Sequence, residues 1–151
     1  TGHTGPNNST INNMRVYNGV AETIPSNQAF SFPTTAVHNG TTITKPDDHS
    51  INLEGDATYL VTYLVHLENT NNEAIGITVN GAVIPGSRVA NTVTGTGVIE
   101  LGASIIIQTP AGANTLQLRN LTATDTKTSP YMSSSLGGSV GAQITIVKLS
   151  N

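Results

Sequence analysis

The sequence contains no cysteine and no tryptophan, and only 10% of its 151 residues are charged. Without cysteine, the chain forms neither a disulfide scaffold nor a thiolate metal site. Its six lysines and arginines are scattered singly and the net charge is −3, so the basic stripe of a nucleic-acid-binding protein is missing. No stretch approaches the roughly 20 apolar residues of a membrane-spanning helix. We therefore expect neither nucleic-acid binding nor membrane insertion.

Polar, uncharged residues take the place of the missing charges. Threonine, asparagine and serine make up about a third of the chain, beside 15 glycines. Threonine favours strands, whereas asparagine, serine and glycine favour turns. This composition predicts short strands joined by tight turns, without a long helix, in a chain long enough for one domain.

Short apolar runs alternate with turn sequences such as Asn39-Gly40, Asn80-Gly81 and Pro85-Gly86. The spacing is typical of a β-sandwich. We predict an all-β, antiparallel jelly-roll sandwich and a long surface loop at residues 122–141. Its ten strands are expected at residues 14–17, 29–32, 41–44, 50–53, 58–67, 75–80, 98–101, 105–109, 115–120 and 142–149.

The strand expected at residues 58–67 is largely apolar on both faces. Tyr59, Val61 and Tyr63 alternate with Leu60 and Leu64. A strand of a free-standing sandwich is apolar on one face only. The second face therefore needs a cover, either loops of the same chain or another subunit, and the repetition of this pattern at residues 105–107 and 142–149 favours a subunit.

No motif assigns a catalytic residue, a cofactor or a metal ligand. Asp47, Asp48 and His49 are adjacent, and neighbouring side chains on a strand point to opposite faces. The Gly-rich stretch at residues 137–141 lacks the strand-to-helix context of a nucleophile elbow or a phosphate cradle. Whether Asp47, Asp48 or Asp56 binds a cation, or forms a shallow hydrolytic site, stays open. We expect a protein that is not an enzyme.

The first six residues place Gly2 and Gly5 three positions apart, followed by Pro6. A collagen strand needs glycine at every third position, because only glycine fits at the crowded axis. The period ends at Asn8, and two triplets alone also occur by chance. We divide the chain into the end of a collagen-like stalk (residues 1–6), a linker (7–13) and a jelly-roll head (14–151).

Several stretches resemble a known family. Residues 55–63, Gly-Asp-Ala-Thr-Tyr-Leu-Val-Thr-Tyr, look like a strand of the complement and tumour-necrosis-factor (TNF) jelly rolls. Residues 77–87, Ile-Thr-Val-Asn-Gly-Ala-Val-Ile-Pro-Gly-Ser, resemble the C-terminal domain of the BclA-type collagen-like glycoproteins of spore exosporia. Residues 97–108 and 142–149 extend this resemblance, which spans residues 14–149.

The resemblance implies a homotrimeric TNF-like head at the tip of a collagen-like filament on the spore surface, outside the cell and without catalysis or cofactor. Its partners would be two further copies of itself, other spore-surface or appendage proteins, and host surface ligands. The strands at 58–67 and 142–149 would lie side by side in the inner sheet, whose outer face meets neighbouring subunits. We expect the trimer interface at Tyr59, Val61, Tyr63, Val65, Ile144, Ile146, Val147 and Leu149.

A second hypothesis is a ligand-binding module. A lectin-like or receptor-binding fibre tip would recognise a specific glycan or host protein through loops such as 33–57 and 122–141. The many exposed threonines and asparagines expected there are compatible with either function.

Overall fold

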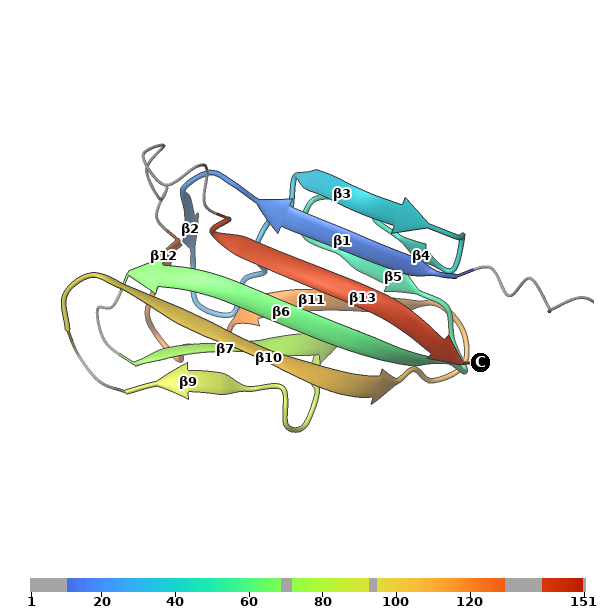
Figure 1. Ribbon diagram of the computed structural model, residues 1–151. Coiled ribbons are helices and arrows are strands. Elements are labelled where there is room, and N and C mark those ends of the chain that lie inside the picture. Colours follow the sequence, from blue (N-terminus) through green and yellow to red (C-terminus); the bar gives the residue numbers. More distant parts are fainter. Residues whose placement is uncertain (1–10, 69–71, 93–94, 130–139, 151) are drawn as a thin grey trace, which may run out of the picture.

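The computed structural model describes residues 11–68, 72–92, 95–129 and 140–150. All regular secondary structure in these residues is β, and thirteen strands are present among them. They form two main antiparallel sheets packed face to face and a small two-stranded sheet at one end (Figure 1).

The first main sheet has five strands, and its central strand is the last one in the sequence. β13 (Ala142–Ser150) lies between β6 (Thr58–Glu68) and β1 (Asn13–Asn18), pairing Ile146 with Val61 on one side and with Met14 on the other. The order across the sheet is β10 (Val98–Gln108), β6 (Thr58–Glu68), β13, β1 (Asn13–Asn18) and β3 (Thr34–Asn39).

The second main sheet is built around β7 (Glu73–Val79) and β11 (Asn114–Asn120). Asn80 and Gly81, with φ of 52° and 83°, make the tight turn between β7 and β8, since this two-residue turn needs positive φ at both positions. The sheet contains β4 (Ile43–Thr44), β5 (Ile51–Leu53), β11 (Asn114–Asn120), β7 (Glu73–Val79), β8 (Ala82–Val83) and β9 (Val89–Asn91), and β12 (Lys127–Ser129) pairs separately with β2 (Glu22–Ile24).

The core lies between the two main sheets. Along β6, every second side chain from Tyr59 to Leu67 is at most 1% exposed. Leu116 and Leu118 of β11 belong to the same buried cluster on the second sheet, as does Phe30 from the segment before β3. All seven residues of β7 are buried.

This packing corrects the expected trimer interface. Six of its eight residues are buried in the core of the chain itself and have no surface for a neighbouring subunit: Tyr59, Val61, Tyr63, Val65, Ile144 and Ile146. Val147 is half-buried, and Leu149 is 51% exposed. The face with the larger aromatic side chains points inward because it encloses more apolar area between the sheets.

Several expected strands also differ from the structure. Residues 98–101 and 105–109 belong to one continuous strand, β10, and residues 29–32 contain only an isolated bridge at Ala29. β3 lies in a stretch without an expected strand, and β12 interrupts the loop expected at 122–141. Asn13, placed in the linker, begins β1. The stalk residues Gly2, Gly5 and Pro6 lie outside the described residues.

Candidate functional site

The five-stranded sheet turns one face away from the core, and we call it the outer sheet face. Its most apolar part is a row across three strands, in which Ile106 of β10 stands opposite Leu60 of β6, and Leu60 stands opposite Val147 of β13. Ile106 is 66% exposed, although its side chain is fully aliphatic. Leu60 and Val147 are half-buried. The row is therefore a band of apolar surface that nothing in the described chain covers.

The next row on the outer sheet face is polar. Ser104, Thr62 and Thr145 stand opposite one another on β10, β6 and β13, and the hydroxyls of Thr62 and Ser104 are 2.8 Å apart. Arg15 continues this row on β1, donates to Gln143 at 3.1 Å and lies over the ring of Tyr17. The outer sheet face thus combines an apolar band with hydroxyl groups, the Arg15 guanidinium and, farther along β6 and β10, the paired His66 and Glu100.

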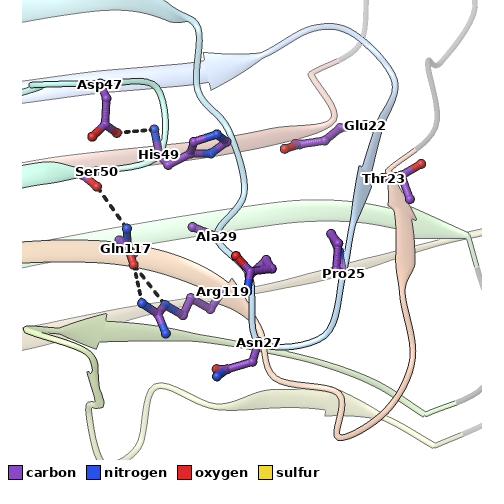
Figure 2. A pocket seen from close by; sticks show the side chains of 11 residues that line it. Glu22, Thr23, Pro25, Asn27, Ala29, Asp47, His49, Ser50, Gln117 and Arg119 are labelled. Carbon is purple, nitrogen blue, oxygen red and sulfur yellow. Dashed lines mark hydrogen bonds between the residues drawn. The ribbon is translucent and has the colours of Figure 1, made fainter.

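A polar groove of about 790 Å³ opens on another part of the molecule, where β2, the segment before β5 and the end of β11 approach one another (Figure 2). Side chains from three separated parts of the sequence line it. They are Glu22, Thr23, Pro25, Asn27, Gln28, Ala29, Asp47, His49, Ser50, Gln117 and Arg119.

The guanidinium of Arg119 is held in place at one wall of this groove (Figure 2). Its Nε and Nη2 both donate to Oε1 of Gln117, at 3.0 and 2.7 Å. Gln117 in turn donates from Nε2 to the Ser50 hydroxyl at 3.0 Å. Because a guanidinium has five N–H donors in a fixed plane, this anchoring orients the remaining donors for an anionic or carbonyl acceptor.

Glu22 lies at the opposite wall of the groove (Figure 2). Its Oε1 accepts a hydrogen bond from the Ser31 backbone N–H at 2.9 Å, and its Oε2 accepts one from Asn18 Nδ2 at 3.2 Å. Burial raises the pKa of Glu22, while these hydrogen bonds and the nearby His49 act in the opposite direction. The groove therefore has a fixed cation on one side and a carboxyl group on the other.

The aspartates considered as a cation or hydrolytic site are not brought together. Asp47 accepts a hydrogen bond from the His49 backbone N–H at 2.7 Å, and Asp48 forms an ion pair with Lys45 at 2.8 Å, which lowers the pKa of Asp48. Asp56 lies beyond the other end of β5, in a turn with φ of 53°. Among the described residues, no group of three or more histidine, aspartate or glutamate side chains is placed to hold a metal ion.

No helix in the described part of the chain is long and apolar enough to cross a membrane. No family model matches the chain, and no similar protein is found among curated proteins. Solved structures do match. The TNF protein Eiger from S. frugiperda superposes with a TM-score of 0.70 at 12% identity, over 94% of each chain.

The chain has the TNF-like jelly-roll fold. Murine APRIL superposes on this jelly roll with a TM-score of 0.65 at 10% identity, over 92% of the present chain and 99% of its own. The globular domain of zebrafish complement 1qA gives 0.60 at 5% identity, over 93% and 99%. The predicted jelly roll is thereby confirmed, with thirteen strands in its described part in place of ten.

The sequence did not point to the polar groove of this jelly roll. Glu22, His49 and Arg119 lie far apart in the chain; Glu22 and Arg119 each stand among neutral residues, while His49 follows Asp47 and Asp48, which the sequence marked only as a possible cation site. Only the pairing of β11 with β5, together with the Ala29–Arg119 bridge, brings them to one groove. No spacing rule connects such residues before the sheet order is known.

Proposed function

We propose that this chain is the trimerisation and display head of a collagen-like filament on the surface of bacterial spores, where it supports assembly and attachment. The observation that carries the proposal is the apolar row Ile106–Leu60–Val147, left open on the outer sheet face. The resemblance of residues 77–87 and 142–149 to the spore glycoprotein family is the reason for placing the filament on the surface of spores. An extracellular location follows from that resemblance.

Further copies of the same chain fit the outer sheet face well. On β10, β6 and β13 the polar row beside the apolar band consists of the hydroxyls of Ser104, Thr62 and Thr145, so this part of the face brings no like charges together when copies meet. An interface with an apolar centre and a polar, hydrogen-bonding rim is typical of protein–protein interfaces, and those of homodimers are the more apolar ones. Val147 and Leu149 keep their predicted place in this interface, while Ile106 and Leu60 replace the six core residues.

The positions of the described ends suit a stalked trimer. β1 begins and β13 ends at the same end of the sandwich, and the turns at β2 and β12 lie at the other end (Figure 1). Three collagen strands must start in register to wind together. A trimer with parallel sandwich axes would bring the starts of three β1 strands to the same end and leave the far ends exposed for attachment.

Sedimentation velocity at micromolar concentration tests the trimer. We expect three times the chain mass of 15.6 kDa. Ile106→Lys should shift the protein to the monomer, because a lysine ammonium would be buried without a partner in the apolar band. Val83→Lys is the matched control: Val83 is an aliphatic residue on β8 of the other sheet, 45% exposed, and its substitution should leave the trimer intact.

A monomeric wild-type protein would contradict the trimer, as would dissociation by both substitutions alike. Far-UV circular dichroism must show unchanged strand content in each variant. The spore setting has its own test, because an antibody against the head should label the outermost layer of intact spores. Labelling confined to the interior would contradict the display function while leaving the trimer result untouched.

A second function is favoured by the polar groove: recognition of an acidic glycan or of an acidic host-protein segment. Arg119 would receive the carboxylate, and the amides of Asn27 and Gln28 would bond neighbouring hydroxyls or peptide groups. A glycan and peptide array probed with the wild type and Arg119→Gln tests this. Saturable binding that the substitution weakens at least tenfold supports it, and no saturable binding contradicts it.

A further inference from the structure

The polar groove holds two opposite charges that do not pair with each other. The carboxylate of Glu22 and the guanidinium of Arg119 line opposite walls of it (Figure 2). All ion pairs in the described part of the chain involve other residues. His49 lies near Glu22, but an imidazole is a cation only when it is protonated. A charge held partly out of water without a counter-charge is costly, so the two groups need an explanation.

The hydrogen-bond partners of both groups are neutral. Arg119 donates to the side-chain carbonyl of Gln117, while Glu22 accepts from the Ser31 backbone N–H and from the Asn18 amide. These bonds orient each charged group and leave its charge uncompensated. Burial raises the pKa of Glu22, as expected for a half-buried carboxylate without a cationic partner.

A tight turn at residues 25–28 forms a further wall of the groove. In this turn Asn27 has a φ of 60°, and the Gln28 N–H donates to the Pro25 carbonyl at 3.1 Å. The buried Asn120 holds the turn, because its carbonyl accepts from the Asn27 N–H at 2.8 Å and its N–H donates to the Gln28 carbonyl at 2.9 Å. Asn27 and Gln28 are themselves exposed. A wall fixed in this way lowers the entropy lost when a ligand binds.

We propose that the groove binds a zwitterionic saccharide, which carries a carboxylate for Arg119 and a free amino group for Glu22. This proposal deepens the second function given above and rests on it. The ligand carboxylate would accept from the guanidinium N–H groups that Gln117 leaves free. The ligand ammonium would donate to the carboxylate lone pairs of Glu22 that its two hydrogen bonds leave free. Each charge of the groove then gains a counter-charge.

The neutral groups of the groove favour a saccharide over a peptide. The amides of Asn27 and Gln28 and the hydroxyl of Thr23 offer both donors and acceptors, which match the hydroxyls of a sugar ring. Pro25 and Ala29 are the apolar residues among those that line the groove. The groove therefore has little apolar surface for the buried side chains that anchor most peptides and proteins. Its volume of about 790 Å³ lies in the range of small-ligand sites.

Calorimetric titration with matched disaccharides of glucosamine and glucuronic acid tests the proposal. The parent ligands keep both charges, one set of relatives has the amine acetylated, and the other has the carboxyl group reduced to an alcohol. We expect saturable binding of a parent, and an affinity about ten- to a hundredfold lower for each of its relatives, because each change removes a charge-assisted contact. In Glu22→Gln the parent and its acetylated relative should bind alike. In Arg119→Gln the parent and its reduced relative should bind alike.

Asp47→Asn is the matched control. Asp47 is the other carboxylate of the groove, but it is exposed and accepts from the His49 backbone N–H. Its substitution should leave the preference for the free amine intact. Loss of that preference in Asp47→Asn but not in Glu22→Gln would overturn the assignment to Glu22.

The ligand series is read on the wild-type protein, so it stays decisive if a variant folds poorly. An acetylated ligand that binds as tightly as its parent would overturn the zwitterion and leave carboxylate recognition by Arg119 standing. Tighter binding of a short peptide that contains lysine and aspartate would overturn the saccharide class. Absence of saturable binding for every ligand, peptide included, would contradict recognition by the groove altogether.

Discussion

Gly102 on β10 stands directly opposite Leu64 on β6, and the Leu64 side chain occupies the space that a Cβ on Gly102 would need. Such a Cβ would lie 2.5 Å from the carbonyl oxygen of Tyr63 and 2.8 Å from Cδ1 of Leu64. Both distances are far below van der Waals contact. The absence of a side chain at Gly102 is therefore a packing requirement of the outer sheet face.

Gly102→Ala should lower the free energy of unfolding by about 1–3 kcal/mol, because the β10 backbone or Leu64 must move to relieve the overlap. Gly19→Ala is the control: the nearest atom to its Cβ would be the Tyr17 ring, 3.8 Å away, so the effect should stay within about 0.5 kcal/mol. Urea denaturation of both variants gives the comparison. Equal stabilities would show that β10 and β6 adjust without strain.

Alkaline pH should destabilise the fold through Tyr63. Its hydroxyl donates to the buried carbonyl of Ser87, and burial raises the pKa of Tyr63 above the usual value of about 10. The unfolded chain therefore loses this proton first. The stability that Tyr63 contributes is complete below about pH 10 and falls as the pH rises toward its folded pKa.

The free energy of unfolding measured across this range should decline above about pH 10, and Tyr63→Phe should decline less steeply. At neutral pH the same variant should be about 1–3 kcal/mol less stable, because the Ser87 carbonyl loses its donor inside the core. Burial raises the pKa of Tyr59 as well, so a reduced slope should remain in Tyr63→Phe. A slope unchanged by the substitution would contradict the assignment to Tyr63.

Glu22 should make an unusual contribution at acid pH. Its pKa is raised by burial above 4.5, so the folded state holds this proton more tightly than the unfolded state. The associated stability is present below about pH 4.5 and is lost as the pH rises through the folded pKa. Relative to Glu22→Gln, the wild type should gain stability on acidification from neutral pH. A relative loss would mean that the hydrogen bonds to the carboxylate outweigh its burial.

Local patterns in the sequence were sufficient to predict the jelly roll. The alternation in residues 58–67 predicts a strand, and the Asn80-Gly81 pair predicts a hairpin turn; both are confirmed. The same alternation does not tell which face points inward, because Leu60 and Leu64 are as apolar as Val61 and Val65. Packing against the opposing sheet decides which face of β6 is buried. It places Tyr59, Val61, Tyr63 and Val65 in the core, where the sequence had suggested a subunit interface.

The segment at residues 29–32 shows a different limit of sequence patterns. Phe30 and Phe32 lie on either side of Ser31, in the alternation of a strand, and both are buried. Their backbone N–H groups, however, donate to two different parts of the chain, Leu118 and Asp48, so no continuous ladder forms.

The central position of β13 has a consequence for how the molecule folds. Of its two neighbours, β1 precedes it by most of the chain and β6 by about half, and of the described strands β13 is the last to be synthesised. Until it arrives, β1 and β3 lack a link to β6 and β10, and each half exposes an unpaired edge that is open to wrong pairing. Folding should therefore be slow, as contacts of high sequence separation require, and completed only after translation has delivered the last strand.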